Sequence, residues 1–317
     1  MNFLSNSKCK TYRVILSFLL LLFIILSFSV KQKRNDLQRS NLKGKVKSVR
    51  EIPYNAVGNA GSVNKGEELF FSDRHYFLSR AFYSVLHVSA ENGDEYGELS
   101  CLSDKLMIQN NYITFNSQGN IMEQMVYKSA MTVSLKCDYK YDLNENLIEC
   151  EFHYENKHRD NVLKWIYTTD KAGNIIEVKT DDADLTVSYK YDDNGNLLEK
   201  KARDKNSNGN YLYLWTFKYD RDGKMLEKLG GNIKITYKYN EKGFMIEEAA
   251  ISFSDRISIR GDGISSYTCN EKGDVIKVEK ENMRINYVYD SNGNWVKKTL
   301  LLNDNPQTII DRVISYY

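Results

Sequence analysis

One short phrase recurs along most of the chain. Residues 189–199 read YKYDDNGNLLE, and residues 287–297 read YVYDSNGNWVK. Most copies have an aromatic-polar-aromatic triplet, then Asp or Asn, two polar residues, Gly and an apolar pair. Eight related units begin at Tyr112, Tyr139, Trp165, Tyr189, Phe217, Tyr237, Tyr267 and Tyr287. The turn positions 119, 145, 173, 195, 223, 243, 273 and 293 lie 20 to 30 residues apart. That period is typical of repeat arrays in which each unit buries its apolar face on its neighbours.

Each unit predicts a β-hairpin. The two rings of a triplet lie on one face of a strand and the residue between them on the other, because side chains alternate along a strand. Asp or Asn then starts a type I turn, and Gly takes the left-handed position that a β-carbon disfavours. The turn glycines are Gly119, Gly173, Gly195, Gly223, Gly243, Gly273 and Gly293, with Glu145 at this place in the second unit. Because both members of the apolar pair are hydrophobic, we expect both faces of the sheet to be partly covered.

These units resemble the YD repeats of the Rhs family. Residues 189–197 and 287–294 match that pattern best, whereas Trp165, Phe217 and Cys269 depart from it. The resemblance covers about 112–317 and implies an all-β fold in which antiparallel hairpins join into one long curled sheet. In large members the sheet closes into a hollow shell around a cargo polypeptide or forms an adhesion scaffold. Eight units are too few to enclose a cargo domain, and we expect no toxin domain after the array.

The rest of the chain divides into four segments. Residues 1–13 are basic, and residues 14–30 are uncharged and mostly apolar, which predicts an uncleaved transmembrane signal-anchor or a cleaved signal peptide. Residues 31–41 are polar and predict a flexible tether. Residues 42–111 predict a capping region, in which residues 44–46 imitate the returning half of a unit. Within it, residues 67–111 form an irregular insertion that is either a helix or two short strands.

Composition and motifs argue against several functions. Lys plus Arg number 44 and Asp plus Glu 42, so the chain has no electrostatic footprint for nucleic acid. The sequence has no zinc-binding His-Glu-x-x-His or Cys-x-x-Cys pattern, no nucleophile elbow and no phosphate-binding glycine loop. We therefore expect no cofactor and no enzymatic activity.

Two candidate sites remain. Asp204, Asn206 and Asn208 match the opening half of a calcium loop, but the closing Glu is replaced by Trp215, and a plain hairpin tip explains Asn208-Gly209 equally well. Cys137 and Cys150 lie equally far on either side of a turn, so a disulfide forms if the turn has no bulge. A glycine-type bulge instead shifts the pairing by one and places the two thiols on opposite faces, but Glu145 in place of Gly favours the unbulged turn. Without the disulfide, the two cysteines are unrelated buried thiols.

The sequence supports two functional hypotheses. The first is a cell-envelope protein, tethered to the membrane through residues 14–30, whose exported repeats bind a glycan or protein in the periplasm or at the surface. The protein is secreted if that segment is cleaved. Its aromatic triplets either contact a ligand or form the packed face of the sheet, and packing is favoured because each unit must bury its apolar face on its neighbours.

The second hypothesis is a structural component whose open terminal strand pairs with a partner. The oligomeric state is not predicted.

Overall fold

The computed structural model describes residues 35–59, 62–70, 110–154, 161–180, 185–204, 211–230, 233–253, 263–279 and 282–317. The chain from residue 34 to residue 317 forms one compact unit. This unit is built almost entirely of antiparallel β-strands, so the predicted all-β class is confirmed. The predicted membrane or signal segment 14–30 lies outside the described residues. Within the described ranges, no helix has the length and apolar character needed to cross a membrane.

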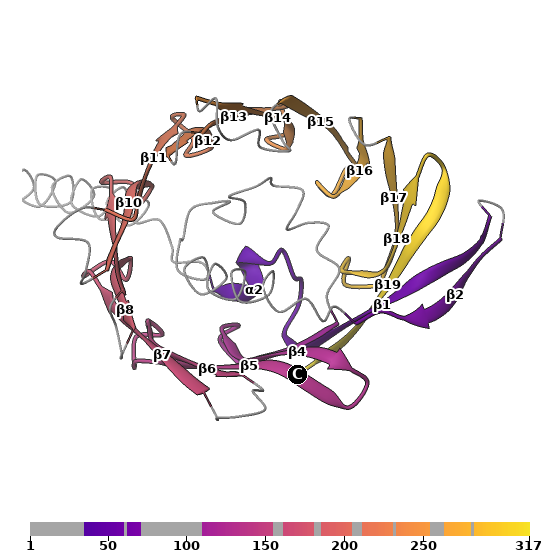
Figure 1. Ribbon diagram of the computed structural model, residues 1–317, viewed down its shortest axis with the longest axis horizontal. Helices are drawn as coiled ribbons and strands as arrows, with labels where there is room; N and C mark the ends of the chain where they lie inside the picture. Colours follow the sequence, from indigo (N-terminus) through magenta and orange to yellow (C-terminus); the bar gives the residue numbers. More distant parts are fainter. Residues whose placement is uncertain are drawn as a thin grey trace, which may run out of the picture. The chain divides into compact units, whose positions relative to one another are not determined.

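The strands follow one another as hairpins (Figure 1). The first ten are β1 (Val46–Asn59), β2 (Ser62–Glu68), β3 (Asn111–Phe115), β4 (Ile121–Ser129), β5 (Thr132–Tyr141), β6 (Leu147–Tyr154), β7 (Asn161–Thr169), β8 (Ile175–Thr180), β9 (Leu185–Tyr191) and β10 (Leu197–Asp204). The others are β11 (Tyr213–Tyr219), β12 (Met225–Gly230), β13 (Ile233–Tyr239), β14 (Met245–Ser252), β15 (Gly263–Cys269), β16 (Val275–Val278), β17 (Met283–Tyr289), β18 (Trp295–Leu302) and β19 (Asn305–Tyr316). A short helix, α2 (Asp36–Arg39), precedes them.

The sheet closes on itself. Strand β1 pairs with β19 along one edge and with β3 along the other, so β1 and β3 to β19 form a continuous ring. Strand β2 pairs only with the far end of β1 among the described residues. The predicted curled sheet is therefore a closed ring and not an open sheet. The open terminal strand that the second functional hypothesis requires is wrong, because β19 is paired with β18 and β1 and offers no open edge.

Closure is made by a ninth unit whose two halves come from distant parts of the chain. Val46 pairs with Tyr316, Ser48 pairs with Ser315, and the bulge between them matches the bulge inside the other units. The Tyr317 N–H donates to the Lys45 carbonyl, and Gly44 has φ 80°. Tyr317 and Gly44 thus occupy the places of the turn Asp and Gly. This confirms the prediction that residues 44–46 imitate the returning half of a unit.

Helix α2 packs on the first repeat. Asn35 caps the helix, and its side chain also donates to the Gln118 carbonyl, while the Leu37 N–H donates to the Gly119 carbonyl. The buried Asp36 carboxylate accepts the Ile121 N–H at 2.7 Å. Residues 35–41 are therefore not the flexible tether predicted, because they satisfy backbone and apolar groups that the first unit exposes at its turn.

The two faces of the sheet differ in chemistry. From the second unit to the seventh, the first ring of the triplet faces the core, as with Tyr139, Tyr189 and Phe217, each 6% exposed or less. On the opposite, outer face, the lysine between the rings pairs with the glutamate that ends the same phrase: Lys140 with Glu149, Lys218 with Glu227 and Lys238 with Glu247.

The apolar pair does not cover both faces as predicted. In six of the eight units its first member is buried, and its second member is the extra residue of a β-bulge that directs it outward. In the third unit, Ile175 is 5% exposed and Ile176 is 38% exposed. The pair is thus explained by the bulge rather than by a second covering layer.

Candidate functional site

All eight turns lie along one edge of the ring, because successive strands alternate in direction. We call this edge the turn rim; it comprises residues 116–120, 142–146, 170–174, 192–196, 220–224, 240–244, 270–274 and 290–294. In the fourth unit, Asp192 Oδ1 accepts the N–H groups of Asn194 and Asn196, and Oδ2 accepts the Asn196 side chain at 2.9 Å. The seven turn glycines have φ values of 75–87°. The acidic residues that start the turns are therefore occupied by backbone donors.

Glu145 replaces the turn glycine of the second unit and still adopts the left-handed conformation, with φ 60°. Its carboxylate accepts hydrogen bonds from Asn116 and Asn120 of the preceding turn, at 3.1 and 2.7 Å. The bulge is also retained, between Lys140 and Tyr141. The expectation that Glu145 favours an unbulged turn was therefore wrong.

Tyrosine hydroxyls link three of the units to the preceding one. Tyr141 donates to the Ile121 carbonyl at 2.8 Å, Tyr191 to the Ile175 carbonyl at 2.9 Å and Tyr239 to the Met225 carbonyl at 2.9 Å. In each case the donor is the last ring of a triplet, and the acceptor is the first apolar residue after the preceding turn. In the sequence, this link is marked by Tyr rather than Phe as the last ring of the triplet, a signal that the predictions above did not include.

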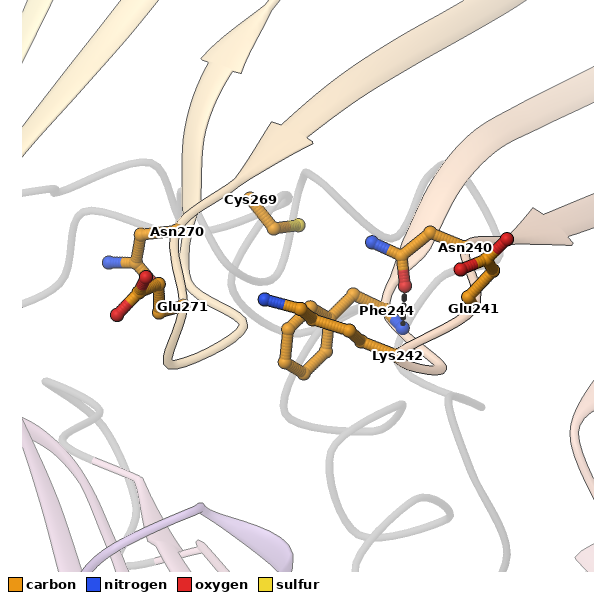
Figure 2. A pocket seen from close by; sticks show the side chains of 7 residues that line it. All are labelled: Asn240, Glu241, Lys242, Phe244, Cys269, Asn270 and Glu271. Atoms are coloured by element: carbon orange, nitrogen blue, oxygen red, sulfur yellow. Dashed lines mark hydrogen bonds between the residues drawn. The ribbon is translucent and has the colours of Figure 1, made fainter.

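The seventh unit lacks this link because Cys269 stands at the place of the linking tyrosine. Its Sγ lies 3.7 Å from the Met245 carbonyl oxygen, the acceptor that a tyrosine would use. A pocket of about 330 Å³ lies between the turns of the sixth and seventh units. It is lined by Asn240, Glu241, Lys242, Phe244, Cys269, Asn270 and Glu271 (Figure 2). Figure 2 shows the Cys269 thiol and the Phe244 ring on the two sides of this space.

The junction between the seventh and eighth units is shifted by two residues. Elsewhere the glutamate that ends a phrase pairs with the residue four before the next turn, as Glu177 pairs with Ser188. Here Lys277 pairs with Arg284, six residues before Asp290. Tyr287 therefore takes the carbonyl link, donating to Val275 at 3.0 Å, and Tyr289 donates to the Asp274 carboxylate at 2.7 Å. A second pocket, of about 500 Å³, lies at this junction.

Charged side chains with little exposure gather where β1, β3, β18 and β19 meet. We call this group, Glu51, Asn111, Trp295, Lys298 and Arg312, the seam cluster. Arg312 Nε donates to Glu51 Oε1 at 2.8 Å, and its guanidinium lies 3.3 Å from the centroid of Trp295. Burial opposes ionisation of Glu51, but Arg312 and Lys298 outweigh it and hold the Glu51 pKa below its usual value. Burial lowers the pKa of Lys298 to about 8.

Of the two predicted sites, the structure describes the side chains of the cysteine pair but not those of the calcium candidates. The side chains of the calcium candidates Asp204, Asn206 and Asn208 lie outside the described residues. Among the His, Cys, Asp and Glu side chains that are described, no group of three or more is placed to hold a metal ion.

The two cysteines neither face each other nor lie on opposite faces of the sheet. Cys150 lies opposite Tyr139, and Cys137 lies opposite Phe152, because the turn and its bulge shift the pairing by two residues in total. Both thiols are therefore buried on the same face as diagonal neighbours, and neither forms a disulfide. Burial raises the pKa of the Cys150 thiol well above its usual value.

The hairpin phrase, the turn geometry and the closed ring define a YD-repeat protein of the Rhs type. The sequence model of the Teneurin YD-shell matches residues 86–300, which is more than half of the chain. The chain therefore belongs to the Teneurin YD-shell family. None of the curated proteins compared matches it.

Several solved structures match parts of the chain. A porin-like protein from Bacteroides uniformis is 10% identical, with 61% of this chain and 96% of that chain covered and a TM-score of 0.39. The TcdB2-TccC3-Cdc42 structure is 10% identical, with 63% and 15% covered and a TM-score of 0.27. The Tc holotoxin pore of Photorhabdus luminescens, carrying a TccC3 mutation, is 12% identical, with 61% and 14% covered and a TM-score of 0.28.

Proposed function

We propose that this protein is a non-catalytic scaffold of the cell envelope that binds a protein partner through the outer face of its closed sheet. The observation that carries the proposal is a recurring apolar side chain on that face. The bulged residue of a unit points outward, and Met122, Ile148, Ile176 and Leu226 are 38–42% exposed. Exposed apolar side chains set among charged ones are typical of protein interaction surfaces.

A protein partner fits this surface better than a glycan. Glycan binding by the triplets would use a row of exposed aromatic rings, but the first ring of each triplet from the second unit to the seventh is 6% exposed or less. The outer face instead offers aliphatic side chains between lysine–glutamate pairs, such as Lys140 with Glu149. Such pairs contribute little to stability at a surface and can instead orient a charged partner.

Site-specific photo-crosslinking tests this surface. A photoreactive amino acid replaces Ile148 or Ile176 in the full chain, in the cells that make it, and Val57 serves as the control position. Val57 is similarly apolar and is 52% exposed, but it lies where β1 extends toward β2, beyond its pairing with β19. We expect a protein adduct of one defined mass from positions 148 and 176 and none from position 57. Equal adducts at all three positions, or none, would contradict the proposal.

Attachment to the membrane is the second part of the proposal, and it is supported by residues 14–30. These 17 uncharged residues are flanked by Lys8, Lys10 and Arg13 before and by Lys31, Lys33 and Arg34 after. At about 1.5 Å per residue, such a helix just spans a bilayer core. We expect the full chain to fractionate with membranes and the double variant Leu20→Arg/Leu22→Arg to leave them. An unprocessed wild-type chain in the soluble fraction would rule this attachment out.

A further inference from the structure

The pocket beside Cys269 marks a break in the hydrophobic core. Most of the buried hydrophobic residues form one cluster that runs from Leu37 to Tyr237 and a second that runs from Tyr267 to Ile285. Met245 packs against both clusters, and its carbonyl is the acceptor of the Cys269 thiol. The core is therefore interrupted at the junction where a linking tyrosine is replaced by a much smaller side chain.

The other junctions define what fits this place. At three of them a tyrosine ring lies between neighbouring units and its hydroxyl donates to the carbonyl of the first apolar residue after the preceding turn, at 2.8–2.9 Å. Thr169 stands at the same place in the third unit, so Cys269 is not the only residue without a ring there. At Cys269, however, the structure has an open pocket of about 330 Å³. A cavity of about 150 Å³ is already large enough to bind benzene.

The lining of the pocket is suited to a ring that carries one polar group. Phe244 offers an aromatic face; it packs so closely on the next turn that a β-carbon on Gly273 would lie 2.8 Å from its ring. The Met245 carbonyl does not itself line the pocket but lies next to a lining residue, with its oxygen 3.7 Å from the Cys269 Sγ; a carbonyl oxygen has two lone pairs, so it can accept a hydroxyl as well. Asn240 and Asn270 hold their own turns, with Oδ1 accepting the N–H groups of Phe244 and Asp274 at 2.9 and 3.0 Å, so the walls are fixed before any ligand enters.

We propose that this pocket binds a phenolic ring, with the ring against Phe244 and the hydroxyl donating to the Met245 carbonyl. The bound ring reproduces the contacts of Tyr141, Tyr191 and Tyr239 at their own junctions. The ligand is either a free phenol or the side chain of a tyrosine on a partner polypeptide, since both present the same atoms. This inference does not depend on the outer-face proposal, because the pocket is at the turn rim.

The test measures protection of the Cys269 thiol in the full chain. The alkylation rate of Cys269 by iodoacetamide is followed by peptide mass spectrometry, which separates it from the other four cysteines. The probes are 4-methylphenol, toluene and the tripeptides Gly-Tyr-Gly and Gly-Phe-Gly. We expect 4-methylphenol at millimolar concentration to slow alkylation at least about threefold and toluene to protect several-fold less, because it lacks the hydroxyl. Equal protection by toluene, or no protection by 4-methylphenol, would overturn the proposal.

The tripeptides separate the two sources of the ring. Protection by Gly-Tyr-Gly but not by Gly-Phe-Gly would support a tyrosine of a partner, and protection by 4-methylphenol alone would support a free phenol. Either result supports the pocket as a phenol site, and protection by Gly-Phe-Gly equal to that by Gly-Tyr-Gly counts against it.

Calorimetry with variants of Cys269 locates the binding site, because this measurement does not need the thiol that alkylation requires. Cys269→Tyr is expected to fill the pocket with its own ring and to abolish binding of 4-methylphenol, whereas Cys269→Ala leaves the pocket open and keeps it. If Cys269→Tyr does not fold, Cys269→Phe gives the same steric block. Binding of 4-methylphenol to a folded Cys269→Tyr or Cys269→Phe protein with unchanged affinity would place the site elsewhere and refute the inference.

Discussion

At the scale of single residues, the tyrosines hold neighbouring units together through their hydroxyls as well as their rings. Tyr191→Phe keeps the ring but removes the donor to the Ile175 carbonyl, 2.9 Å away. A buried acceptor left without its donor costs about 1–3 kcal/mol. We therefore expect this variant to lower the free energy of unfolding by roughly that amount in urea titrations. Tyr211→Phe is the control, because Tyr211 is 40% exposed and its loss should change stability by about 0.5 kcal/mol or less.

Equal effects of the two substitutions would show that the hydroxyl links are not structural. The sequence shows the tyrosines that form these links, but it does not show which carbonyl accepts each hydroxyl. The alternation of the triplet fixed which rings share a face, because that is a local property of a strand. The partner of each hydroxyl lies in another unit, 14 to 20 residues away, and depends on the register between units.

Glu145 offers a second residue-scale prediction, in which backbone strain and side-chain bonding are separated. Both Glu145→Ala and Glu145→Gly remove the carboxylate that accepts from Asn116 and Asn120. Only glycine also relieves the left-handed conformation at φ 60°, which costs a residue with a β-carbon roughly 1 kcal/mol. We expect the alanine variant to be the less stable of the two by about that amount in thermal and urea unfolding. An alanine variant as stable as the glycine variant would show that the turn is not strained.

At the scale of elements, the hairpins could be predicted, but the closure could not. Each hairpin is specified within about a dozen consecutive residues by its triplet, turn and apolar pair. The pairing of β1 with β19 joins residues more than 250 positions apart, such as Glu51 and Arg312. Gly44-Lys45-Val46 gave the only local sign of it. The pocket at Cys269 was likewise visible as a departure from the repeat, but its volume depends on Phe244 and on the neighbouring turn.

Lys298 of β18 makes the stability of the folded protein depend on pH in a predictable direction. Its pKa is about 8 in the folded protein and about 10.4 in an unfolded chain. Between these values the unfolded state binds more protons, so the contribution of Lys298 to stability rises with pH. Below pH 8 the buried charge costs the fold up to roughly 3 kcal/mol. Lys298→Met should therefore be more stable than the parent at pH 7, and its advantage should shrink as the pH rises from 8 to 10.

Urea unfolding at pH 7, 8, 9 and 10 measures this difference directly, since all other groups are shared by parent and variant. Lys238→Met is the matched control on the outer face, where the Lys238 side chain is 69% exposed. It should change stability by no more than about 0.5 kcal/mol. A Lys298→Met protein less stable than the parent at pH 7 would show that the seam cluster needs this charge to hold Glu51.

At the scale of the whole molecule, the ninth unit predicts that the ring tolerates a different order of its strands. In every intact unit, two residues separate the Asp or Asn that starts the turn from the left-handed Gly or Glu145, as Asp193 and Asn194 do in the fourth. If residue 317 were bonded directly to residue 42, then Leu42 and Lys43 would separate Tyr317 from Gly44 in the same way. The Tyr317 N–H already donates to the Lys45 carbonyl at 2.9 Å, which matches the bond from Asp192 to the Asn196 carbonyl. The split unit is therefore one peptide bond away from an ordinary turn.

A circular permutant tests this equivalence. The chain is joined from residue 317 to residue 42 and opened between Asp193 and Asn194, and a second permutant is joined from 317 to 43. The unpermuted chain that begins at residue 42 is the reference, since all three lack α2. We expect the first permutant to melt within about 5 °C of the reference and the second to melt lower by about 5 °C or more, because its turn is one residue short and moves Gly44 out of the left-handed position. Identical melting of the two permutants would mean that β19 and β1 pair as independent strands and that the ring is not closed by a ninth repeat.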